Sequence, residues 1–169
     1  TYTISKKNFE KEGRYNVTID SEDAATNTMN NKLKDSNINF VIDKTPPTVV
    51  ITGIEENSYR ADSRDMTVNL SDNTAVKKLD IQINGESVAT YDQKEIEKAG
   101  GQISYAIESV NSKQNIKAVA VDMANNETVS EEHTVLVTTN LLIQYINNTP
   151  VFVGSIIVIV AGVGAAVYF

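Results

Sequence analysis

Apolar and polar residues alternate with a period of two over much of the chain. In the segment MTVNLSD, the residues Met66, Val68 and Leu70 fall on one face of an extended backbone. Successive side chains of a β-strand point to opposite faces, so this alternation predicts a strand with one buried face. The same pattern predicts strands in KLDIQING, QISYAIES, NIKAVAVD and HTVLVTT, and the pair Asn84-Gly85 predicts a hairpin turn. Short strands separated by turn residues are typical of an antiparallel β-sandwich.

Helical structure is predicted at two places. The segment DQKEIEKAGG, which begins at Asp92, has room for a helical turn that its glycines end. From Val151 to Phe169 the sequence is apolar except for Ser155, and as a helix it spans about 28 Å, close to the hydrocarbon thickness of a bilayer. A buried core helix is the alternative, but a β-sandwich has no place for a helix that is apolar all round. We therefore predict a transmembrane helix over residues 150–169.

Residues 140–149 form a juxtamembrane segment before the predicted span. Leu141, Leu142, Tyr145 and Ile146 recur at helical spacing, which suits a short helix lying at the membrane surface. No Asp, Glu, Lys or Arg occurs after His133, so charge does not indicate the orientation of the span. No LPxTG-like sorting signal precedes it, which favours a retained membrane anchor over transfer to the cell wall.

A block of sequence recurs after about 100 residues, the length of one sandwich domain. The segment YNVTIDSEDAATN, beginning at Tyr15, matches IKAVAVDMANN, beginning at Ile116, and both contain Asp-x-Ala-x-Asn. YTIS, beginning at Tyr2, matches YAIE as a strand before this block, and INFVID matches TVLVTT as a strand after it. We therefore interpret residues 1–43 as the C-terminal strands of a truncated domain and residues 44–139 as a complete one.

The joint between the two copies contains two consecutive prolines. In DKTPPTVVITG, Pro46 and Pro47 stand directly before the first strand of the complete domain. Proline fixes φ and has no backbone donor, so it suits an extended connector or the beginning of an edge strand. We expect a semi-rigid spacer here.

Three segments in order carry a family resemblance. DKTPPTVVITG, then LSDNTAVKKLDIQING, then VAVDMANNE together resemble a bacterial immunoglobulin-like repeat of the kind found in tandem on Gram-positive surface proteins. The resemblance covers residues 43–139, and part of a previous copy in residues 1–42. It implies an immunoglobulin-like antiparallel β-sandwich and a stalk or adhesion module. Asn125, and Thr26 in the first copy, stand where the family prefers Gly; Asn tolerates the positive φ that this position takes.

Composition narrows the classes of function. The net charge is −7 and Lys and Arg are scattered, which argues against a nucleic-acid partner. The sequence has no cysteine, which excludes disulfides, thiolate catalysis and thiolate metal ligands. The single histidine, His133, has no second His or Cys to complete a site, so we expect a surface residue rather than a general base or metal ligand. We predict no enzyme activity, no catalytic residues and no cofactor.

Two predicted turns are rich in carboxylate and amide oxygens. Asp72 stands beside Asn73, and Asp122 precedes Asn125 and Asn126. Such turns sometimes bind calcium. Asp and Asn in turns also accept hydrogen bonds from local backbone N–H groups. We favour this local role and predict no metal site; a calcium titration distinguishes the two roles.

These observations predict a non-catalytic extracellular stalk or spacer in a single-pass, membrane-anchored bacterial surface protein, with the lipid bilayer as its partner and the sandwiches outside the cell. Because the sequence begins at Thr1 without an initiator Met or signal peptide, we expect it to be the C-terminal part of a longer chain. Two alternatives remain: an adhesin module that binds a protein or glycan on a host or neighbouring cell, and an accessory module of a surface enzyme. An aromatic content of 7% without Trp disfavours glycan binding. The sequence does not indicate an oligomeric state.

Overall fold

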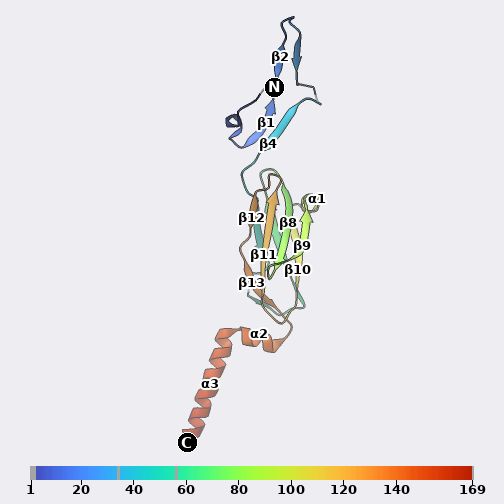
Figure 1. Ribbon diagram of the computed structural model, residues 1–169. Helices are drawn as coiled ribbons and strands as arrows, with labels where there is room; N and C mark the ends of the chain where they lie inside the picture. The colour runs from blue at the N-terminus through green and yellow to red at the C-terminus, as the bar shows by residue number, and fades with distance from the viewer. Residues whose placement is uncertain (1–2, 34, 56, 169) are drawn as a thin grey trace.

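The computed structural model describes residues 3–33, 35–55 and 57–168, with side chains up to Val160. The described chain is elongated, with a small N-terminal region, a β-sandwich and two C-terminal helices following one another (Figure 1). The polar alternating part of the sequence forms strands, and the apolar tail forms helix.

The N-terminal region consists of short elements, and none of its described residues is buried. A 3₁₀ helix η1 (Lys6–Phe9) precedes strand β1 (Gly13–Val17), which pairs antiparallel with β4 (Ile38–Ile42). Between them, β2 (Asp20–Glu22) pairs antiparallel with β3 (Thr28–Asn30). The rings of Phe9, Tyr15 and Phe40 lie 5.1 to 5.3 Å apart and hold these elements together.

The strand predicted for YTIS is wrong over its described part. Residues 3–5 have no strand structure, and Tyr2 lies outside the described residues. Ser5 instead caps η1, because its hydroxyl accepts a hydrogen bond from the N–H of Lys7. Serine favours such caps since its side chain replaces a missing backbone acceptor.

The sandwich consists of two sheets. In one, β7 (Ser63–Ser71) lies between β5 (Thr48–Thr52) and β10 (Gln102–Glu108). The other has the order β6–β13–β11–β8–β9, and β12 also pairs with β11. Its strands are β6 (Ser58–Tyr59), β8 (Val76–Ile83), β9 (Glu86–Asp92), β11 (Gln114–Asp122), β12 (Glu127–Val129) and β13 (His133–Val137). All pairs are antiparallel except β6 with β13, which gives an immunoglobulin-like β-sandwich.

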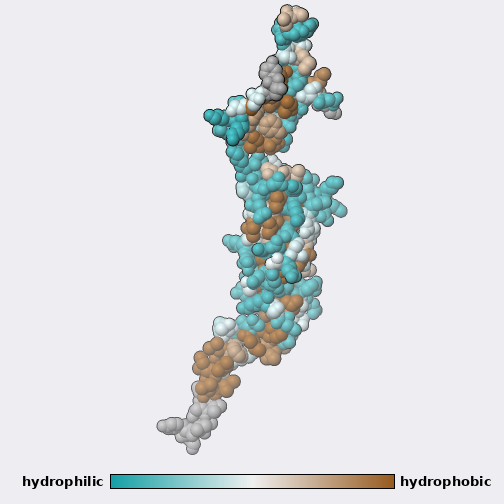
Figure 2. Space-filling model, viewed as in Figure 1, coloured by the Kyte–Doolittle hydropathy of each residue, from teal (hydrophilic) through white to brown (hydrophobic). Residues whose placement is uncertain are grey.

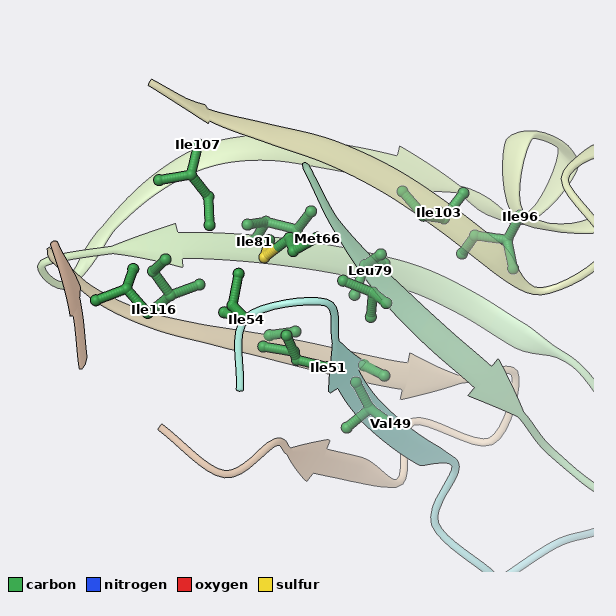
Figure 3. Packing of buried hydrophobic residues seen from close by; sticks show 14 of the residues in the cluster. Val49, Ile51, Ile54, Met66, Leu79, Ile81, Ile96, Ile103, Ile107 and Ile116 are labelled. Carbon is green, nitrogen blue, oxygen red and sulfur yellow. The ribbon is translucent and has the colours of Figure 1, made fainter. Parts of the chain in front are cut away.

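The inner faces of the two sheets form the hydrophobic core (Figure 3). Met66 and Val68 of β7, and Leu79 and Ile81 of β8, are wholly inaccessible to solvent, as the period-two alternation predicted. The central strand β11 has the longest buried series, with every second residue buried from its first to its last. Burial of these side chains stabilises the sandwich by about 25 cal/mol for each Å² of apolar surface removed from water.

Two local predictions within the sandwich are confirmed. The β8–β9 hairpin turns at Asn84 and Gly85, which both have positive φ, as a two-residue hairpin turn requires. Helix α1 (Gln93–Lys98) forms in the segment predicted for a helical turn. Its N-cap Asp92 accepts a hydrogen bond from the N–H of Glu95, and the Glu95 side chain accepts one from the N–H of Asp92.

The apolar tail forms two helices that meet at a sharp angle. Helix α2 (Leu141–Asn147) begins at the N-cap Asn140, and α3 (Thr149–Tyr168) follows almost directly. Over the described residues, no single helix has the length and hydropathy needed to cross a bilayer; α2 and residues 149–160 satisfy both only as a pair bent by 88°. Figure 2 shows apolar surface over both helices, in contrast with the mainly hydrophilic sandwich.

Candidate metal centre

Three aspartates from distant parts of the sequence meet where the linker joins the sandwich. Asp43 follows β4, Asp72 follows β7, and Asp122 is the last residue of β11. One carboxylate oxygen of each lies within 4.8 Å of the other two. The site lies at the end of the sandwich that faces the N-terminal region (Figure 1).

Asp122 is wholly buried and organises the turn after β11. Its Oδ1 accepts a hydrogen bond of 2.8 Å from the N–H of Asn126, and its Oδ2 accepts one of 2.7 Å from Asn126 Nδ2. The intervening Asn125 takes a φ of 67°. Asp122 therefore has the local role that the sequence predicted for it.

Asp72 has one satisfied and one unsatisfied oxygen. Its Oδ2 accepts hydrogen bonds from the N–H of Thr74, at 2.9 Å, and from Thr74 Oγ1, at 2.7 Å. Its Oδ1 is buried and has no hydrogen-bond partner. The local hydrogen bonds expected in a turn thus satisfy only one of the two oxygens of Asp72.

Asp43 connects the linker to both turns. Its carboxylate accepts hydrogen bonds from Thr74 Oγ1 at 2.6 Å, from the N–H of Thr45 at 3.0 Å and from Asn73 Nδ2 at 3.2 Å. The Thr74 bond contributes most to holding the pKa of Asp43 below its ordinary value. The backbone carbonyl of Asp43 accepts a further bond of 3.2 Å from Asn126 Nδ2.

The Thr74 hydroxyl lies at hydrogen-bonding distance from Asp43 and from Asp72 but has a single proton. The hydroxyl therefore donates its proton to one carboxylate at a time, and the other carboxylate then faces a lone pair of the hydroxyl oxygen. Within the described ranges the one ion pair is Lys32–Asp20, in the N-terminal region. Lys77 donates to Asn125 Oδ1 rather than to a carboxylate. Among the described residues, therefore, no Lys, Arg or His forms an ion pair with any of the three aspartates.

The donor set suits a hard cation. All three groups offer carboxylate oxygens, the ligands that Ca²⁺ and Mg²⁺ bind. In the described part of the chain this is the one cluster of three or more potential metal-ligating side chains. His133 lies at the beginning of β13, half-buried, and does not belong to it.

Asp43 was not among the candidates that the sequence indicated. Asp72 and Asp122 were noticed because each stands next to asparagine in a predicted turn, whereas Asp43 belongs to a linker. A signal was present, since Asp43 stands three residues before the two prolines that direct the chain into β5. Only the pairing of β5 with β7 places the linker beside the turn that contains Asp72.

Comparisons with known proteins identify no family for this chain. No protein-family model matches the sequence, and no curated protein matches it. Among solved structures the chain is similar to fibronectin(III)-like modules of Clostridium thermocellum CbhA, with a TM-score of 0.47 and 17% sequence identity. That match covers 77% of this chain and 65% of the other, just under two thirds of its length. At this identity and TM-score, the likeness assigns no activity to this chain.

Proposed function

We propose that the chain is a non-catalytic stalk module of a bacterial surface protein, held in the cell membrane by α3 with its sandwich outside the cell. The observation that carries the proposal is the serial path of the chain. The chain enters the sandwich at Thr48, which pairs with Ser71 near the end of β11. It leaves the sandwich after Val137, at the opposite end, because the preceding Val135 pairs with Gln114 at the start of β11.

Because the chain enters and leaves the sandwich at opposite ends, the sandwich separates the segments before and after it and acts as a spacer. The nine residues of β11 alone extend the chain by about 30 Å. Linker contacts on both sides favour a stiff joint: Glu12 accepts hydrogen bonds from the N–H of Lys44 and from Thr45 Oγ1, while Thr74 and Asn126 bond to Asp43.

A repeat of this module is supported by the geometry of the N-terminal region. The antiparallel pairs Asp20–Asn30 and Val119–Val129 are offset by 99 residues at both positions. In the turns between them, Asp23 bonds to Asn27 as Asp122 bonds to Asn126, and Thr26 and Asn125 both have positive φ. The pair β2–β3 and its turn therefore resemble the pair β11–β12 and its turn, which supports the proposal that residues 1–43 belong to a preceding copy of the module.

Membrane anchoring is supported by the surface of the helices. Val158, Ile159 and Val160 of α3 are 63 to 71% exposed, a continuous apolar surface that water solvates poorly. Leu141 and Leu142 of α2 are also more than half exposed. If α3 crosses the bilayer, the 88° bend places α2 along the membrane surface, where its apolar side chains are accommodated.

Charges placed in α3 test the anchoring. We expect the double variant Val158→Arg/Ile159→Arg to be lost from liposomes in a flotation assay, since each Arg near the centre of a span costs about 3 kcal/mol. The matched control, Val88→Arg/Val129→Arg, adds the same charge at exposed sandwich positions and is expected to float like the unmodified chain. Equal flotation of both double variants would contradict anchoring by α3.

A further inference from the structure

We propose that Asp43, Asp72 and Asp122 bind one calcium ion at the joint between linker and sandwich. Calcium–oxygen bonds are about 2.4 Å long, so two oxygens on opposite sides of one ion lie about 4.8 Å apart. The three carboxylate oxygens meet this limit, each lying within 4.8 Å of the others. The three oxygens are therefore close enough for one ion to bind them after small side-chain adjustments.

The burial of Asp122 and of one oxygen of Asp72 is an independent reason for a cation. Asp122 is 0% exposed, and Oδ1 of Asp72 is buried without a hydrogen-bond partner. A carboxylate taken out of water is strongly disfavoured unless a cation or a full set of donors replaces its hydration. Neither Asp72 nor Asp122 forms an ion pair with any of the described residues. A calcium ion bound to the three carboxylates offsets the cost of removing them from water.

Calcium suits this site better than other metals. The cluster contains no nitrogen or sulfur ligand, which argues against zinc and copper. Magnesium requires near-ideal octahedral geometry, whereas calcium accepts irregular sets of six to eight oxygens that include water. Three carboxylates from three separate segments form such an irregular set. Calcium sites of the weakest class bind with a dissociation constant of about 0.1 to 1 mM, and we expect this affinity here.

A bound calcium ion would stiffen the joint between the linker and the sandwich. Asp43 belongs to the linker, while Asp72 and Asp122 belong to the sandwich, so calcium adds a connection across the boundary to the hydrogen bonds already present. The site itself is independent of the proposed stalk function; only its role in stiffening a stalk rests on that function. Calcium binding and membrane anchoring are measured separately, so one can fail without the other.

Calorimetric titration of the full chain in non-ionic detergent with calcium chloride tests the site. We expect one ion per chain, with affinity at least tenfold lower in the separate variants Asp43→Asn and Asp72→Asn. The matched control Asp65→Asn removes one exposed carboxylate from β7, outside the cluster, and is expected to bind as the unmodified chain does. Circular dichroism of each variant shows whether it is folded. Asp43 lies half-buried in the linker, outside the hydrophobic core, so Asp43→Asn provides a variant whose folding does not depend on a core side chain.

Two results would overturn the proposal. One is the absence of any heat of binding, and of any calcium-dependent shift in thermal unfolding relative to chelator, at about 10 mM calcium chloride, tenfold above the expected range. The other is undiminished binding by folded Asp43→Asn, which would place the ion elsewhere.

Discussion

At the scale of single residues, backbone conformation decides which side chains the turns accept. Thr26 and Asn125 have φ values of 65° and 67° in turns with the same hydrogen bonds. The sequence indicated this position, because the repeats that the sequence resembles prefer Gly there. Asn reaches positive φ readily, whereas a β-branched residue such as Thr is unusual in this region.

Among the glycines whose surroundings the structure describes, Gly101 has the tightest. Its φ is 76°, and a Cβ there would lie 2.6 Å from the carbonyl oxygen of Leu70, whose N–H donates to the carbonyl of Gly101. We expect Gly101→Ala to lower the free energy of unfolding by about 1 to 3 kcal/mol more than Gly100→Ala, because overpacking adds to the cost of positive φ. Gly100 is the matched control, with a φ of 64° and no atom near its Cβ position.

Urea unfolding of both variants, followed by tyrosine fluorescence, measures the difference. Equal destabilisation would mean that the backbone of β7 moves aside freely and that the close approach has no energetic consequence.

At the scale of elements, α1 is a short helix that depends on its cap. Six residues are too few for a stable isolated helix, so the reciprocal bonds between Asp92 and Glu95 and the burial of Ile96 determine whether it forms. We expect Asp92→Ala to cost about 1 kcal/mol of stability, whereas Asp92→Ser, which retains a cap acceptor, costs only a few tenths. Thermal unfolding of the two variants measures this, and an equal loss in both would show that the cap contributes nothing.

The elements that the sequence predicted are those with a local signal. Strands β7, β8, β10 and β11 alternate with period two because one face of each lies on the core, whereas β13 was indicated by its apolar run, whose last three residues are all buried. Strand β6, two residues long, had no such signal, since its parallel pairing with β13 depends on tertiary contact. Part of the candidate site was not predicted because it also depends on tertiary contact. Asp43 meets Asp72 and Asp122 only after β5 has paired with β7.

At the scale of the whole molecule, the described chain is a series of units that follow one another in space as they do in sequence (Figure 1). The linker is bonded to both neighbours, through Glu12 on one side and Thr74 and Asn126 on the other. At the other end, the hydroxyls of Tyr145 and Ser155 bond to each other and join α2 to α3. These contacts favour a stiff, extended arrangement of the units over units joined by flexible linkers.

The central claim is that α3 anchors the chain in the cell membrane with the sandwich outside the cell. Fractionation of protoplasts tests this claim most directly. Cells that express the chain are converted to protoplasts, washed with high salt, treated with protease and then extracted with detergent. The account predicts that the chain stays with the membranes through the salt wash, that protease added outside removes the sandwich, and that only detergent releases the remaining α3. Recovery of the intact chain in the wall fraction, or its release by salt alone, would contradict the account.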